Sequence, residues 1–103
     1  MNNITVVVER ISPTTAKEYL ATNLNNRKVN RQTVLFYKKQ MLDGNWQLSP
    51  EGISFDKYCN LLDGQHRLLA VIEANVSVSF IVSRGFDREV FSVINTGKNR
   101  NAS

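Results

Sequence analysis

The hydrophobic pattern of this chain changes its period at Gly64. Just before this glycine, Leu61 and Leu62 form a short apolar run of the kind found in strands. Just after it, Leu68 and Val71 are spaced so that both lie on one face of a helix. A glycine allows the tight turn that such a change of period requires. The sequence therefore predicts a strand, a turn at Gly64 and a helix, in that order.

The other segments predict three further strands and three further helices. Ser12 followed by Pro13 is typical of a helix start, with Ser12 as the N-cap residue. A second helix is expected from Asn30 to about Leu42, and the alternation over residues 76–82 gives the clearest strand. The remaining expected elements are strands at 4–8 and 53–55, a hairpin turn at 57–60, and a short fourth helix that starts at Asp87 with Phe86, Val90, Phe91 and Ile94 as its apolar face. This order predicts a compact α+β domain with a small mixed sheet and about four helices, rather than a wound parallel sheet.

The apolar residues also predict which side chains are buried. The run over residues 4–8 is rich in β-branched residues, which indicates a largely buried strand. Trp46 is expected to lie partly buried over the sheet, with stacking on a nucleic-acid base as the alternative. Cys59 is expected to be a buried, inert thiol. The apolar stripe of the second helix is expected to consist of Val34, Leu35, Met41 and Leu42.

Length and composition limit the class of protein. The chain has 103 residues, of which 42% are hydrophobic, and this suits a single domain over 1–103 with a loose tail at 98–103. No apolar run approaches the ~20 residues that cross a bilayer, and the first residues lack the pattern of a signal peptide. The lone Cys59 excludes an internal disulfide and a Cys-rich zinc site. We therefore expect a cytoplasmic domain with no membrane partner.

The charges are unevenly distributed along the chain. The net charge is +4, and one stretch holds five basic residues with no acidic residue between them. These five are Arg27, Lys28, Arg31, Lys38 and Lys39, which we call the basic cluster. Lys98 and Arg100 form a second group. Such clusters favour an anionic partner, such as a nucleotide, a nucleic acid or an acidic protein, and we expect the basic cluster to bind nucleic acid. The alternative is that the charge serves solubility alone.

Polar residues that suit phosphate come directly after the predicted turn. The first turn of a helix carries unpaired backbone N–H groups and the positive end of the helix dipole, so it binds anions. A cation there is unfavourable for the helix itself, which favours a functional reason for His66 and Arg67. Arg67 can hold a phosphate through two parallel hydrogen bonds, and His66 can donate another. The predicted phosphate or nucleotide ligands are Gly64, Gln65, His66 and Arg67, with Lys98 and Arg100 brought to the same phosphates by the end of the fourth helix.

A structural alternative explains the same residues without a ligand. Asp63 is a good N-cap residue and Gly64 a good turn residue. Arg67 can pair with Asp63 or with Glu73, which lies farther along the same predicted helix. The spacing alone leaves both interpretations open.

Asp63 is the predicted metal ligand and, with His66, the predicted catalytic residue. Asp56 and Asp63 flank the expected hairpin, so their carboxylates can approach each other and hold Mg²⁺ beside a phosphate. In this hypothesis Asp63 positions Mg²⁺ or a water molecule, and His66 polarises or protonates a phosphate oxygen. The alternative is that both aspartates only cap turns.

The segment Asp63-Gly64-Gln65-His66-Arg67-Leu68, followed by Ala70, resembles the signature box of the ParB/sulfiredoxin-like superfamily. The resemblance extends to the short, often phage-encoded ParB-like nuclease domains, and it covers nearly the whole chain. Further landmarks are Asn26-Arg27, Gly44-Asn45-Trp46, Ile53-Ser54-Phe55-Asp56, and Ile94-Asn95-Thr96-Gly97-Lys98 with Arg100.

The resemblance implies a pocket for nucleotide phosphates. In such families the box binds CTP in partition proteins and ATP in sulfiredoxins, which implies that Gly64, His66 and Arg67 contact phosphate. Sulfiredoxins carry their catalytic cysteine where this chain has Gln65, so sulfinic-acid reductase activity is not expected. Partition proteins carry Glu and Arg where this chain has Gln65 and His66, and their box is succeeded by a helix-turn-helix domain. The 103 residues leave no room for such a domain after the box, so sequence-specific DNA partitioning is not expected either.

Two functions are compatible with these observations. The first is a domain that binds nucleotide or nucleic-acid phosphates, with CTP or ATP and Mg²⁺ as the expected cofactors, and with weak metal-dependent nuclease or NTPase activity. The second is a non-enzymatic protein of a phage or mobile element that binds and inhibits a host protein or nucleic-acid complex. Release of phosphate or nicking of DNA in the presence of Mg²⁺ distinguishes them.

Overall fold

The computed structural model describes residues 3–24 and 27–89. In these ranges it contains three helices and four strands, which confirms the α+β class with three helices in place of the expected four. The expected fourth helix lies mostly outside the described residues, as do the tail at 98–103, Lys98 and Arg100, and Phe86 belongs to a strand instead. The elements are β1 (Thr5–Ile11), α1 (Pro13–Leu20), α2 (Arg31–Leu42), β2 (Ile53–Asp56), β3 (Leu61–Asp63), α3 (Gln65–Ala74) and β4 (Val78–Phe86).

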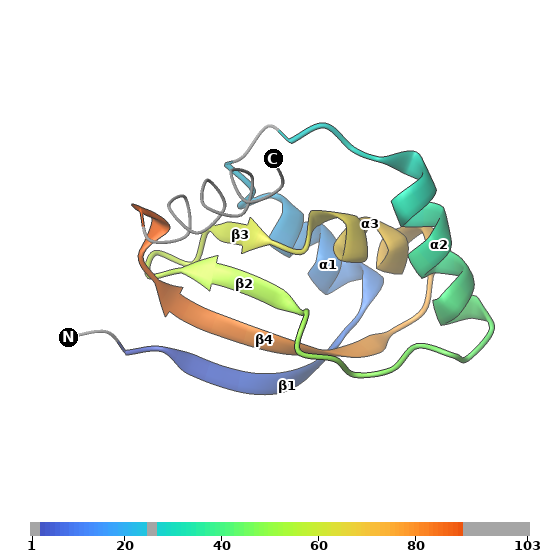
Figure 1. Ribbon diagram of the computed structural model, residues 1–103, viewed down its shortest axis with the longest axis horizontal. Coiled ribbons are helices and arrows are strands. Elements are labelled where there is room, and N and C mark those ends of the chain that lie inside the picture. Colours follow the sequence, from blue (N-terminus) through green and yellow to red (C-terminus); the bar gives the residue numbers. More distant parts are fainter. Residues whose placement is uncertain (1–2, 25–26, 90–103) are drawn as a thin grey trace, which may run out of the picture.

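The four strands form one mixed sheet in the order β1-β4-β2-β3. β4 pairs antiparallel with β1 and parallel with β2, and β2 forms an antiparallel hairpin with β3. The mixed sheet that the order of elements predicted is confirmed. The three helices lie on the same side of this sheet, and β1 lies at its outer edge (Figure 1).

Local capping explains where the helices begin and end. The Ser12 hydroxyl accepts a hydrogen bond from the Thr15 N–H at 3.2 Å, with Pro13 at the first helical position, as the sequence predicted for α1. Asn30 caps α2 in the same way through the Thr33 N–H at 3.2 Å. Asn75 ends α3 in a left-handed conformation, which an asparagine tolerates better than most residues. No helix among the described residues is long and apolar enough to cross a membrane.

The hydrophobic core lies between the sheet and the helices. α3 packs against both α1 and α2, so it is the central helix of this layer. The sheet contributes the inward side chains of alternate strand positions, as the period of two requires. Fully or almost fully buried members are Ile11, Ala16, Val34, Ile53, Phe55, Leu61, Leu68, Ala70, Val71, Phe80 and Val82.

Two predictions of burial are wrong because of where the elements lie. The run that was expected to be a buried strand forms the start of edge strand β1, where the side chains of Val6 and Val8 are 62% and 60% exposed. On α2, only half of the predicted stripe is buried. Val34 and Met41 enter the core, whereas Leu35 and Leu42 face solvent, because α3 covers only a narrow side of this helix.

The predicted burial is confirmed for Trp46 and wrong for Cys59. The Trp46 ring is partly buried against the core, with edge contacts to Phe80 and Tyr37 at centroid distances of 5.3 and 5.6 Å, which confirms the predicted position. Cys59 was expected to be buried, but its thiol is exposed. This cysteine lies in the β2–β3 turn with φ of 67°, outside the paired residues of the two strands.

Gly52 passes close to the backbone of β4. A Cβ atom at this position would lie 1.9 Å from the Ile81 carbonyl oxygen, so no other residue fits without moving the strand. We expect Gly52→Ala to lower the free energy of unfolding by about 2–3 kcal/mol, as in other overpacked sites. Gly44→Ala is the matched control. Its φ is +74° with nothing within 4 Å, so only the cost of a left-handed alanine, about 1 kcal/mol, applies.

Urea denaturation of the two variants and the parent measures both values. If Gly52→Ala is no less stable than Gly44→Ala, the close contact between Gly52 and Ile81 is not a constraint on the fold.

Candidate phosphate-binding site

The turn at Gly64 has the geometry that the change of period predicted. Gly64 is the N-cap residue of α3, with φ of 116° and ψ of 10°, a region that suits glycine. A Cβ atom here would also lie 2.6 Å from Ile53 Cδ1 and 3.3 Å from the Gly52 carbonyl oxygen. Both the backbone conformation and the close packing on β2 therefore require glycine at this position.

The first turn of α3 has no side-chain cap. α1 and α2 each receive a capping bond from Ser12 or Asn30, but no side chain of the described residues caps α3, and its first turn holds no acidic residue. Asp63 Oδ1 instead accepts the N–H of Gly64 at 3.0 Å. The first N–H groups of α3 thus remain directed toward the space in front of the helix, where an anion is favoured.

Arg67 is a nearly buried cation beside this turn. Its side chain is only 12% exposed and donates to the Gly52 carbonyl oxygen at 3.3 Å and to Glu51 Oε1 at 3.2 Å. The guanidinium also lies over the ring of Tyr37 at 5.4 Å. Glu51, in contrast, is 80% exposed. Arg67 therefore pairs with Glu51, and not with Asp63 or Glu73 as the structural alternative suggested.

His66 joins the start of α3 to the start of α2. Its Nε2 accepts the backbone N–H of Asn30 at 2.9 Å, so the imidazole is neutral and its proton lies on Nδ1. Partial burial lowers the pKa of His66, and the nearby guanidinium groups of Arg27 and Arg67 lower it further. Nε2 is therefore occupied by the Asn30 N–H and does not face a phosphate oxygen. The Nδ1–H group remains as the hydrogen-bond donor that His66 can offer to a phosphate.

The two aspartates of the hairpin do not share a site. Asp63 pairs in register with Ser54, whereas Asp56 lies at the other end of the hairpin. Asp56 is 3% exposed, and its Oδ1 accepts the N–H groups of Tyr58 and Asn60 at 2.8 and 2.9 Å. The expected approach of the two carboxylates is wrong, because Asp56 stabilises its own turn. Among the described residues, no three His, Cys, Asp or Glu side chains lie together where they could hold a metal ion.

Gln65 has a buried acceptor atom with no partner. Its Oε1 is inaccessible to solvent and accepts no hydrogen bond from the described residues. An unmade hydrogen bond of this kind costs about 1–3 kcal/mol.

The basic cluster is largely neutralised by carboxylates. Arg31 forms two hydrogen bonds with Glu73 at 2.6 and 2.8 Å, and Lys39 pairs with Asp43 at 2.9 Å. Arg27 lies 3.9 Å from Asp63, which brings this one member to the Gly64 turn. Lys28 precedes α2. Lys38 and Lys39 lie on this helix, about 12 Å along its axis from the N-terminal end that His66 contacts. The structure thus brings Arg27 to the predicted phosphate site but leaves the two α2 lysines apart from it.

A cavity of about 230 Å³ opens beside Arg67. Its walls include the aromatic rings of Phe36, Tyr37 and Trp46, and Glu51 lies at the same cavity as Arg67. Sequence reasoning missed Glu51, Tyr37 and Asn30 as partners of the site. No local signal marks them, since each meets the box only through tertiary contacts across more than ten residues of chain.

No family model, curated protein or solved structure matches this chain. Its function is therefore inferred from the geometry of the site itself.

The His66–Asn30 bond predicts a pH dependence of stability. Because the folded protein holds a neutral imidazole, the unfolded chain binds the proton first as the pH falls through about 6.5. The free energy of unfolding should therefore fall between pH 7.5 and 5, above the range in which carboxylates titrate. His66→Gln keeps an acceptor and does not titrate, so its profile should be flat over this range.

Thermal unfolding from pH 7.5 to 5 checks this expectation, because the chain has a single histidine. Parallel profiles for the parent and His66→Gln would show that the imidazole is not held neutral by Asn30.

Proposed function

We propose that this chain is a cytoplasmic phosphate-binding domain of the ParB/sulfiredoxin-like type, which holds a nucleotide or nucleic-acid phosphate between Arg67 and the first turn of α3. The observation that carries the proposal is the environment of Arg67. Its guanidinium is nearly buried, yet its carboxylate partner is the largely exposed Glu51. Arg67 belongs to the first turn of α3, and the uncapped start of this helix supplies further N–H donors.

Glu51 stands where a ligand anion would bind. The Glu51 side of this ion pair is open to solvent, so an incoming phosphate can reach the guanidinium and replace the carboxylate. A phosphate accepts two parallel hydrogen bonds from a guanidinium, as a carboxylate does, and adds charge that favours the helix start. Arg67 is kept in place during the exchange by the Gly52 carbonyl oxygen and the Tyr37 ring.

The surroundings of Arg67 support a nucleotide rather than a bare anion. The aromatic side chains of the adjoining cavity offer faces or edges to a base, and stacking of this kind is worth about 1–3 kcal/mol. Arg27, about half exposed, is close enough to the turn to contact a second phosphate.

Catalysis in this proposal depends on Asp63. Its carboxylate is about half exposed and close to the turn, so it can hold Mg²⁺ together with phosphate oxygens and water, which is how Mg²⁺ is usually bound. His66 would contribute its Nδ1–H as a hydrogen-bond donor to a phosphate oxygen. A nuclease or NTPase of this design is weak, because one carboxylate and one neutral imidazole supply its chemistry.

Substitutions at Arg67 and Glu51 should change phosphate affinity in opposite directions. Arg67→Gln removes charged hydrogen bonds worth about 1.5–3 kcal/mol, so the affinity for CTP, ATP or pyrophosphate should fall at least about tenfold. Glu51→Gln removes the competing carboxylate, so the affinity should rise by up to about fivefold. Calorimetric titration of each variant measures both effects.

Lys57→Gln is the matched control, because it also removes one positive charge but lies in the β2–β3 turn, at the opposite end of the hairpin from the Gly64 turn. Equal affinities for the parent and Arg67→Gln would refute the site. A panel of mononucleotides and single-stranded oligonucleotides then distinguishes a nucleotide from a nucleic acid as the ligand.

Asp63→Asn should abolish turnover and strengthen binding. The asparagine oxygen can still accept the Gly64 N–H, so the turn is preserved, whereas the charge that would hold Mg²⁺ is lost. The same change removes repulsion between this carboxylate and a phosphate. Metal-dependent release of phosphate and nicking of DNA are measured on both proteins, after their melting curves are shown to agree.

Turnover that persists in Asp63→Asn rejects the role given to Asp63. Turnover that is absent from the parent, with binding intact, leaves a phosphate-binding domain without catalysis.

A second candidate function, a non-enzymatic protein binder, is favoured by the outer side of α2. Leu35 and Leu42 are each at least half exposed there, and Lys38 and Lys39 lie beside them. A surface of this kind suits an acidic protein with apolar residues. If neither nucleotides nor oligonucleotides bind at Arg67, this second function replaces the first.

A further inference from the structure

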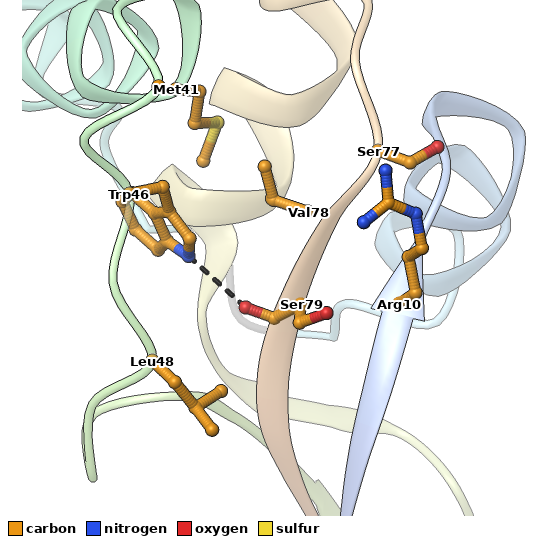
Figure 2. Close-up of a pocket in the computed structure, with 8 residues that line it drawn as sticks. Arg10, Met41, Trp46, Leu48, Ser77, Val78 and Ser79 are labelled. Atoms are coloured by element: carbon orange, nitrogen blue, oxygen red, sulfur yellow. Dashed lines mark hydrogen bonds between the residues drawn. The ribbon is translucent and has the colours of Figure 1, made fainter.

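A second cavity, of about 350 Å³, lies over the start of β4 and apart from the Gly64 turn. Figure 2 shows its two walls, with Trp46 and Leu48 on one side of β4 and Arg10 and Ser77 on the other. Its volume falls within the range of small-molecule sites, which begins at about 300 Å³. The room equals that of about a dozen water molecules at ~30 Å³ each.

One wall is apolar and firmly held. The Trp46 indole N–H donates to the Ser79 carbonyl oxygen at 3.2 Å, and its ring contacts Phe80 and Tyr37 edge to face. Met41, only 5% exposed, supports the ring from α2. This wall therefore presents a preformed apolar surface that needs no rearrangement to receive a ligand.

The opposite wall carries an uncompensated cation. Arg10 is exposed on β1, in register with Ser79, and its side chain forms no ion pair or hydrogen bond with any other residue that the structure describes. In contrast, Arg31, Arg67 and Arg84 each pair with a glutamate. None of the residues that line this cavity is acidic, and Ser77 and Ser79 add two hydroxyl groups.

We propose that this cavity binds a small organic carboxylate with a flat apolar body. The carboxylate would receive two parallel hydrogen bonds from the Arg10 guanidinium, with Ser77 as a further donor. The apolar body would lie against Trp46 and Leu48. A few convergent polar groups beside an apolar wall are the usual composition of a small-molecule site. This cavity and the one beside Arg67 share the Trp46 ring but differ in their cation and polar groups, so variants of Arg10 and Arg67 distinguish them.

The probe for this proposal is 2-naphthoate, with 2-naphthamide as its uncharged isostere. Titration is followed by ¹H–¹⁵N correlation spectra, in which the indole N–H of the single tryptophan gives one distinct signal at the cavity. We expect 2-naphthoate to shift this signal and the amide signals of residues 77–79. Its affinity should exceed that of 2-naphthamide at least about tenfold, and Arg10→Gln should remove this difference.

Lys17→Gln is the control, because it makes the same change of charge on an exposed position of α1 and should leave the affinity unchanged. Arg10 has no partner among the described residues to lose, so its substitution should keep the melting temperature of the parent. Equal affinity of the two probes, or of the parent and Arg10→Gln, overturns the proposal. Binding that is lost in Arg67→Gln but kept in Arg10→Gln also overturns it, because the aromatic carboxylate then occupies the phosphate site.

Discussion

The close passage of the chain at Gly52 is the constraint on which the site depends. Because Gly52 has no side chain, it can lie against the carbonyl of Ile81, and β2 can then begin beside β4. The Gly52 carbonyl oxygen accepts a hydrogen bond from Arg67 and lies close to Gly64. One residue thus fixes the entry to β2, the turn before α3 and the position of the guanidinium. A shift of the chain here would move all three together.

The same contacts resolve an electrostatic conflict at the start of α3. Two potential cations in the first turn of a helix oppose the helix dipole. In the structure the neutral form of His66 is favoured, because burial and the nearby guanidinium groups lower its pKa and its Nε2 accepts the Asn30 N–H. The charge of Arg67 is compensated by Glu51, which belongs to a different segment of the chain. The helix start therefore tolerates both residues while its own N–H groups remain available.

Sequence reasoning succeeded where the information is local. Ser12, Asn30 and Asn75 act within a few residues of themselves, so the ends of the helices could be predicted from side-chain chemistry and backbone preference. Gly64 was found because the change of period occurs at a glycine, and the structure gives this residue the positive φ of the turn. The α+β class and the mixed sheet could be predicted from the order of these elements.

The remainder depends on contacts between distant segments. A run of valines is as suitable for an edge strand as for a central one, so the exposure of Val6 and Val8 could not be read from it. The exposure of Leu35 and Leu42 depends on how much of α2 is covered by α3. In the candidate site, the residues of the box were identified, but the partners of His66 and Arg67 lie 36 and 16 positions away. Spacing within the box carries no information about them.

The place of β1 has a consequence for the protein as it is synthesised. β1 is the first strand of the described chain to leave the ribosome, yet its one neighbour in the sheet is β4, roughly 70 residues later. At about 5–20 residues per second, the nascent chain carries an unpaired β1 for roughly 4–14 seconds. During this time the valines and backbone N–H groups of β1 are open to other unfolded chains. The pairing of β1 has to wait for the last strand that the structure describes, so β1 stays an open edge for most of the synthesis of this domain.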